Sequence, residues 1–147
     1  MYDTVPACGQ MRGSVFVLPV RVYYEDTDAG GIIYYANYLK FAERARTEFI
    51  RSFGCRQQDG LEADEACGFA VKHLEIEYHR PAVLDDALEV TCRVTEIKGA
   101  SAVMHQEIWR GEELLVSLDV RVAHLSLKKK RPVRIPETLV SAIQKNM

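Results

Sequence analysis

The sequence predicts an α+β protein in which one amphipathic helix packs against a five-stranded antiparallel sheet. One stretch repeats apolar residues at spacings of three and four, the period of a helix face: Tyr38, Phe41, Ala42, Ala45, Phe49 and Phe53. Other stretches alternate apolar and polar residues, the period of half-buried strands. Because a helix and a sheet that each carry one apolar face can bury those faces together, the two patterns indicate a layered architecture.

The elements follow one another in a simple order. A first strand is expected over 14–24, where Pro19 favours an edge position or a bulge. The long helix comes next. Four further strands are then expected at 74–78, 88–94, 102–110 and 113–125. Very short turns join the last three, which predicts an antiparallel meander. The polar connection over 57–67 is expected to contain a short helical turn, and a final short helix is expected beyond Pro136.

The length of 147 residues fits a single domain spanning 1–147. Residues 1–13 carry little pattern and are interpreted as a loose leader, whereas 132–147 form a C-terminal extension. The second face of the sheet and its edge would still need cover, because exposed strand edges invite pairing with other chains. A homo-oligomer is therefore expected.

Composition indicates an ordinary globular protein, with 48% hydrophobic and 27% charged residues. The formal charge of −2 argues against a general nucleic-acid binder. No apolar run approaches the ~18 residues of a membrane span, and the N-terminus lacks the long apolar region of a secretory signal. The cysteines show no C-x-x-C and no regular spacing, which favours reduced thiols in a cytoplasmic protein: Cys8, Cys55, Cys67 and Cys92.

A polar, glycine-bearing turn precedes the long helix and holds the residues with the clearest chemistry. Gly30 and Gly31 allow the backbone to turn tightly, and Asn37 is expected to cap the helix. The start of a helix gathers unpaired N–H groups and the positive end of its dipole. Asp28 precedes Tyr35 and lies close to that helix start. The N–H groups could polarise a carbonyl oxygen while the carboxylate attacks or activates water, so acyl transfer is the first reaction class predicted.

The signature of this segment is E-D-T-D-A-G-G-I-I-Y-Y-A-N-Y at 25–38, followed by E-R-A-R-T-E at 43–48. These residues resemble those of the hotdog-fold acyl-CoA thioesterases, and the resemblance extends from about 20 to 136. The most similar group is the Tol–Pal-associated acyl-CoA thioesterases of Gram-negative bacteria, which are relatives of 4-hydroxybenzoyl-CoA thioesterase. The resemblance implies a sheet wrapped around one long central helix, and hydrolysis of a thioester to a free acid and a thiol.

The resemblance also implies roles for two residues. Asp28 matches the catalytic carboxylate of the family, acting either as a nucleophile that forms a mixed anhydride or as a general base for water. Tyr35 matches the residue whose backbone N–H polarises the thioester carbonyl. The Tol–Pal-associated members usually carry histidine there, whereas the 4-hydroxybenzoyl-CoA enzymes are similar to this chain in carrying tyrosine. A backbone role survives that change, so the departure bears on substrate preference more than on hydrolysis.

Seven further residues are candidates for binding the substrate: Gly31, Tyr38, Lys98, Ser101, Lys128, Lys129 and Arg131. The tyrosine would either line the acyl pocket or belong to the core. The basic run near 130 would either grip the phosphates of coenzyme A, whose charge lysine and arginine complement, or form a solvated tail. The turn near 100, with Lys98 and Ser101, would likewise either bind those phosphates or be solvated. No aromatic residues interleave with the basic run, which disfavours nucleic acid.

For the assembly, the resemblance implies dimers with a continuous sheet, commonly paired into tetramers, and an acyl-CoA site near a subunit interface. It implies no metal and no prosthetic group, since coenzyme A is part of the substrate. An acyl-CoA or an acyl group on a carrier protein is the expected substrate. Lipid-synthesis or Tol–Pal-related proteins are candidate partners.

Two alternatives to hydrolysis remain open. A hotdog dehydratase would pair a histidine with an acid on the helix segment, and the absence of histidine before His73 counts against it. A non-catalytic protein would use the same fold to bind acyl-CoA or to dock on lipid-synthesis and envelope proteins. Release of free thiol from acyl-CoA discriminates between these readings. The four histidines show no zinc-binding spacing: His73, His79, His105 and His124.

Overall fold

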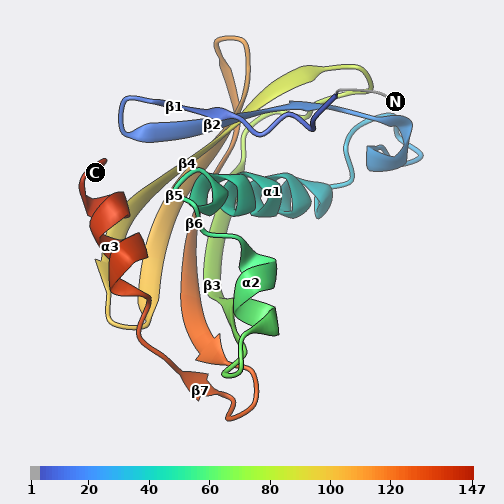
Figure 1. Cartoon of the computed structure of the whole chain (residues 1–147). Helices are drawn as coiled ribbons and strands as arrows, with labels where there is room; N and C mark the ends of the chain where they lie inside the picture. Colours follow the sequence, from blue (N-terminus) through green and yellow to red (C-terminus); the bar gives the residue numbers. More distant parts are fainter. Residues whose placement is uncertain (1–3) are drawn as a thin grey trace.

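The computed structural model describes residues 4–147 (Figure 1). Within them, one long helix, α1 (Asn37–Arg51), lies against a single antiparallel sheet of seven strands. The strands are β1 (Gln10–Arg12), β2 (Val15–Arg21), β3 (Cys67–Tyr78), β4 (Ala87–Lys98), β5 (Ser101–Arg110), β6 (Glu113–Ser126) and β7 (Arg131–Pro132). They run in the order β1-β2-β4-β5-β6-β3, and β7 pairs with the end of β6. The short helices are η1 (Tyr24–Asp26), α2 (Gln57–Glu62) and α3 (Glu137–Gln144).

The predicted α+β architecture is confirmed. The five predicted strands are the longer strands β2 to β6, and β4, β5 and β6 form the predicted meander. The helical turn in the 57–67 connection is α2, and the final helix is α3. Figure 1 shows the sheet curving around α1. In that view α3 lies at the left of the strands and α2 lies at the right. The sequence does not predict the two short strands, β1 and β7.

The core lies between α1 and the concave face of the sheet. Ala42 and Ala45 on α1 are fully buried, and their small side chains let the helix approach the strands closely. Phe49 packs edge-on against Phe16 of β2, with ring centroids 6.0 Å apart. Alternate residues of β4 face the helix, as the period of two requires: Leu88, Val90, Cys92 and Val94.

Three local expectations need correction. Asn37 does not cap α1: it is the first helical residue, Ala36 holds the cap position, and the Asn37 amide instead donates to the Asp26 carbonyl at 2.8 Å. The helix ends at Arg51 rather than continuing through Phe53, because the chain turns there and reaches Gly54 with φ +84°. Residues 10–12 of the predicted loose leader form β1, which pairs with β2; residues 1–3 lie outside the described part of the chain.

The strand β3 forms one edge of the sheet. It pairs with β6 along its length, and within residues 4–147 no strand pairs with its other side. Val71 is 50% exposed on this strand, and the pairing register shifts between Val71 and His73. A long strand edge with an exposed apolar side chain is a surface that folded proteins normally cover. This is the edge for which the sequence analysis expects a partner.

Candidate active site

The turn between η1 and α1 is held together by Asp26, the first aspartate of the D-T-D motif. Asp26 is only 8% exposed, and its Oδ2 accepts a hydrogen bond from the Tyr23 N–H at 2.8 Å. Its carbonyl accepts from the Tyr34 N–H at 3.1 Å and from the Asn37 amide at 2.8 Å. Asp26 therefore ties the beginning of the turn to the beginning of α1. Its role is structural.

The second aspartate, Asp28, presents its carboxylate to solvent at the tip of this turn. Its N–H donates to the Ile32 carbonyl at 2.8 Å, and its carbonyl accepts from the Gly31 N–H at 3.1 Å. Gly31 has φ +83°, a backbone conformation that favours glycine. Oδ1 accepts from the Gly30 N–H at 2.8 Å, while Oδ2 has no hydrogen-bond partner among residues 4–147. The carboxylate is thus fixed through one oxygen and free at the other.

The start of α1, where the sequence predicts an electrophilic element, carries backbone N–H groups without acceptors. The Asn37 N–H donates to the Tyr34 carbonyl at 2.8 Å, and the Leu39 N–H donates to the Ala36 carbonyl at 3.1 Å. In the described part of the chain, the N–H groups of Tyr35 and Ala36 have no acceptor. Together with the positive end of the helix dipole, these free donors can bind an oxygen that gains negative charge.

Aromatic side chains gather around this helix start. The rings of Tyr34 and Tyr35 have centroids 4.9 Å apart, and Tyr35 meets Tyr78 edge-on at 6.2 Å. The Tyr78 hydroxyl donates to the Tyr35 carbonyl at 3.1 Å, so the end of β3 holds the peptide unit that follows the candidate donor. Burial raises the pKa of Tyr78, which keeps this phenol protonated as a donor at neutral pH.

Tyr38 occupies the core rather than an open pocket. It is 3% exposed, and its hydroxyl accepts from the Ala82 N–H at 3.0 Å. The Ala82 carbonyl in turn accepts from the Ile33 N–H at 3.0 Å, and Val83 forms a β-bridge with Ile32. The loop between β3 and β4 therefore supports both the carboxylate turn and the first turn of α1.

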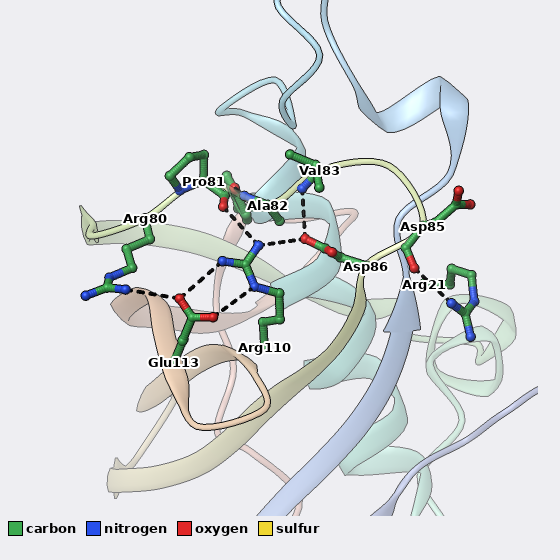
Figure 2. A network of polar contacts seen from close by, with 10 residues as sticks. Arg21, Arg80, Pro81, Ala82, Val83, Asp85, Asp86, Arg110 and Glu113 are labelled. Atoms are coloured by element: carbon green, nitrogen blue, oxygen red, sulfur yellow. Dashed lines mark hydrogen bonds and ion pairs between the residues drawn. The ribbon is translucent and has the colours of Figure 1, made fainter.

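A polar network holds that supporting loop in place (Figure 2). The Arg110 guanidinium, at the end of β5, donates from Nη1 to the Asp86 carboxylate at 2.7 Å and to the Pro81 carbonyl at 3.3 Å. The Arg110 Nη2 lies 3.3 Å from the Glu113 Oε2, and the Arg80 Nη1 lies 3.1 Å from the same oxygen. The guanidinium thus joins the loop to the β5–β6 turn.

Burial would raise the pKa of Asp86, but the hydrogen bonds from the Val83 N–H and from Arg110 outweigh it, so the pKa lies below its ordinary 3.8. The unfolded chain then binds more protons than the folded chain between the folded-state pKa and 3.8. The stability that Asp86 contributes is therefore complete above 3.8 and is lost as pH falls through the folded-state pKa.

We expect Asp86→Asn to lower the free energy of unfolding at pH 7 by about 1–2 kcal/mol, because the charged partner of Arg110 is lost. The difference between native protein and variant should shrink as pH falls from 5 to 2.5. Urea denaturation across that pH series measures it. A difference that stays constant with pH would show that the ionised Asp86 carboxylate does not stabilise the fold.

The predicted substrate-binding residues divide into two groups. Gly31 lies in the turn beside Asp28, whereas the basic run near 130 lies at the β6–β7 turn, at the opposite end of the molecule in Figure 1. Lys98 and Ser101 flank the β4–β5 turn, where the Ser101 hydroxyl donates to the Lys98 carbonyl at 3.4 Å. One chain therefore brings Asp28, Gly31 and Tyr35 together, but not the basic residues.

A cavity of about 80 Å³ lies beneath the second half of α1, between this helix, the start of β3 and α3. Most of its lining is apolar, and the first residues of β3 at its wall belong to the exposed sheet edge: Phe69, Ala70 and Val71. Glu43 and Arg46 supply polar atoms on the helix side. An apolar space of this kind suits an acyl chain better than a charged group.

The contributions of Tyr78, Asp86 and Arg110 to the site are not predicted from the sequence. The only local signal is that Tyr78 ends a predicted strand, and nothing near Arg110 in sequence links it to Asp86. Within residues 4–147, no group of three histidine, cysteine, aspartate or glutamate side chains is placed to hold a metal ion. In the same residues, no helix is both long and apolar enough to span a membrane.

A curved antiparallel sheet around one long helix, preceded by a turn that carries an exposed aspartate and backbone N–H groups without acceptors, is the arrangement expected of a hotdog-fold thioesterase. The chain belongs to the thioesterase superfamily, whose family model matches residues 30–117. It is 46% identical over 132 residues to the acyl-CoA thioesterase YbgC of Haemophilus influenzae, covering 90% of this chain and 96% of that protein. It is 42% identical to the acyl-CoA thioester hydrolase YbgC of Escherichia coli, covering 89% of this chain and 97% of that protein.

Solved structures of thioesterases are similar in fold to this chain. A probable thioesterase from Bartonella henselae superposes with a TM-score of 0.80 at 36% identity, covering 83% of this chain and 99% of that chain. A 1,4-dihydroxy-2-naphthoyl-CoA thioesterase from Synechocystis has a TM-score of 0.81 at 22% identity, covering 88% and 96%, and shows the shared fold. The comparisons confirm the resemblance, the hotdog fold and thioester hydrolysis as the class of reaction. They do not favour the dehydratase or the non-catalytic alternative.

Proposed function

We propose that this protein hydrolyses an acyl-CoA to a free acid and coenzyme A, with Asp28 and the Tyr35 N–H as the catalytic groups. The observation that carries the proposal is that one short turn presents both an exposed carboxylate with a free oxygen and an N–H without an acceptor. The relatives named acyl-CoA thioesterases support coenzyme A as the thiol. An acyl group on a carrier protein is the second candidate substrate.

In the proposed mechanism the thioester carbonyl oxygen binds at the Tyr35 N–H. The carbonyl carbon is attacked either by the free Oδ2 of Asp28 or by a water whose proton Asp28 accepts. The oxygen becomes negatively charged, and the N–H and the helix dipole stabilise that charge. When the C–S bond breaks, the thiolate leaves; on the general-base route it takes the proton that Asp28 accepted from water, and on the nucleophilic route it takes a proton from solvent. On the nucleophilic route, water then cleaves the mixed anhydride and restores the carboxylate.

The proposed chemistry draws on side chains and backbone alone, so we propose that it requires no metal and no prosthetic group; coenzyme A enters only as part of the substrate. The Tyr35 side chain is 62% exposed and acts, if at all, on the acyl or pantetheine group rather than on the carbonyl. We further propose a cytoplasmic location, with lipid-synthesis or Tol–Pal-related proteins as partners, because the chain is similar to the YbgC proteins over nearly its whole length.

We propose that two copies pair through the β3 edge into a continuous sheet, and that such dimers pair into tetramers. Antiparallel pairing about a two-fold axis places the start of β3 in one copy beside the end of β3 in the other. The start of β3 lies next to the β6–β7 turn, since Cys67 pairs with Ser126. The end of β3 is Tyr78, which contacts Tyr35. The basic run and the cavity of one copy would therefore approach the Asp28 turn of the other.

Free-thiol release tests the function directly. The protein is assayed with short-chain, long-chain and aromatic acyl-CoAs and with acyl groups on a carrier protein. We expect turnover of at least one class, and the ranking of kcat/KM identifies the acyl group. Absence of thiol release from every substrate, at enzyme concentrations equal to substrate, would contradict the proposal.

Val71→Asp tests the proposed dimer. A carboxylate near the middle of β3 would be buried in the proposed interface, so we expect the dimer dissociation constant to rise at least about a hundredfold. Sedimentation velocity over a dilution series measures this, and thioesterase activity should fall in parallel because the site needs both copies. Val5→Asp, the same substitution at a more exposed valine outside β3, is the control. A Val71→Asp protein that stays dimeric would refute pairing through this edge.

A further inference from the structure

The Arg110 guanidinium grips the loop between β3 and β4 at two points (Figure 2). One nitrogen, Nη1, contacts both the Pro81 carbonyl at 3.3 Å and the Asp86 carboxylate at 2.7 Å. These two residues flank Ala82 and Val83. The arginine therefore fixes the segment on both sides, while the remaining nitrogens are held by a carboxylate of the β5–β6 turn.

The segment that Arg110 fixes also contacts the turn between η1 and α1, which carries Asp28. Val83 bridges Ile32, and the Ile32 carbonyl is the acceptor of the Asp28 N–H at 2.8 Å. The position of Asp28 thus depends on the backbone of the supporting loop. Ala82 makes two hydrogen bonds to this region: its carbonyl accepts from the Ile33 N–H, and its own N–H donates to the hydroxyl of Tyr38 in the first turn of α1.

We propose that Arg110 is a positioning residue for thioester hydrolysis, holding the Asp28 carboxylate and the Tyr35 N–H at one spacing through the 81–86 loop. This inference rests on the proposed function. Both proposed catalytic groups lie on one turn, and the loop contacts this turn through the Ile33–Ala82 hydrogen bond and the Ile32–Val83 bridge. The fixed fork of arginine suits the task, because its planar donors can reach a carbonyl and two carboxylates at once, which a lysine cannot.

Kinetics of Arg110→Gln give the first test. We expect kcat to fall about ten- to a hundredfold, because small displacements of reacting groups have effects of that size. KM should stay within about twofold, since Arg110 is not placed to touch the substrate. Arg110→Lys, which keeps the charge but lacks the fork, should lose most of the same activity. Arg80→Gln is the matched control: it removes an arginine from the same network without freeing the loop, and should remain close to native.

The partner residue gives a second kinetic test. If Arg110 acts by holding Asp86, then Asp86→Asn alone should lower kcat, and adding it to Arg110→Gln should lower kcat little further. The effects of two independent residues would instead multiply.

Amide hydrogen exchange provides a readout that needs no activity. The N–H groups of Asp28 and Ile33 are hydrogen-bonded in the native protein, and we expect their exchange to become at least about tenfold faster in Arg110→Gln. Amides of β4, which lies between β2 and β5, should exchange at native rates, and that of Val90 is an example. Arg80→Gln should leave all three unchanged.

Any of the following results would overturn the inference: native kcat in Arg110→Gln, unchanged exchange at both turn amides, or an equal loss of kcat in Arg80→Gln. A uniform rise in exchange that includes Val90 would also overturn it, because the variant would then be globally destabilised. If the native protein releases no thiol at all, the proposed function fails, and the exchange rates alone decide whether Arg110 positions the turn.

Discussion

Asp28→Asn is expected to lower kcat for thioester hydrolysis by about a hundredfold or more, the range for a lost acid–base group. Asparagine has nearly the same shape, and its amide oxygen can still accept from the Gly30 N–H that now binds Oδ1. The turn should therefore keep its conformation. The change removes the negative charge at the free oxygen, which both proposed routes require: a neutral amide neither attacks a thioester readily nor accepts a proton from water.

The measurement is free-thiol release at saturating substrate, with native protein and variant compared at matched concentration and oligomeric state. Glu25→Gln is the control, because it neutralises another exposed carboxylate of the same turn. Its kcat should stay within about twofold of native, since exposed substitutions away from the reacting groups have small effects. KM should change little in either variant, because the proposed contacts with coenzyme A lie elsewhere. Equal activity of Asp28→Asn and native protein would show that Asp28 only shapes the turn.

The parts of this structure that could be predicted are those encoded in short-range periodicity. The spacing of Phe41, Ala42 and Ala45 predicts which face of α1 is buried, and all three are fully buried. The alternation in β4 predicts its inward residues equally well. The position of Asp28 beside a helix start also follows from nearby residues alone. Each of these conclusions needs no knowledge of which distant segments meet.

The parts that could not be predicted depend on contacts between segments that are remote in sequence. Asn37 is a favourable cap residue by local rules, but it donates to the carbonyl of Asp26 and leaves the cap position to Ala36. Asp86 lies in the loop before β4 and Arg110 lies at the end of β5, and only the pairing of β4 with β5 brings them together. The separation of the basic turn from Asp28 is likewise a property of the folded chain, and it is the reason that the proposed site includes a second copy.

Gln106 shows the same limit in the core. It sits between Met104 and Ile108 on the inward face of β5 and is 0% exposed. Its Nε2 donates to the Ala42 carbonyl at 2.9 Å and to the Thr91 carbonyl at 3.2 Å. The alternation of β5 predicts that this residue faces inward, but it does not reveal a partner for a buried amide. The partner is on α1.

The amide oxygen of Gln106 accepts a hydrogen bond from Arg46 of α1, whose Nη1 donates to Oε1 at 3.0 Å. The Arg46 side chain is only 11% exposed. Burial lowers the pKa of Arg46, although the nearby Glu43 carboxylate raises it. The charged guanidinium is therefore in an environment that disfavours it, with one exposed carboxylate at 3.3 Å and one buried amide as partners. Loss of the amide leaves a largely buried charge without its interior hydrogen bond.

Gln106→Leu is accordingly expected to lower the free energy of unfolding by about 3 kcal/mol, the cost of leaving a buried charged donor poorly paired. Adding Arg46→Met should recover most of this loss, because two apolar side chains of similar volume need no hydrogen bonds and can pack against the neighbouring cavity. Urea denaturation of both single variants and the double variant measures the coupling. Arg44→Met, at an exposed position on the same helix, is the control and should change stability by less than about 1 kcal/mol. The free energy of unfolding of the double variant could instead fall by the sum of the two single losses. In that case Arg46 and Gln106 stabilise the core independently. The cost of Gln106→Leu must then come from the shape of leucine rather than from the unpaired guanidinium.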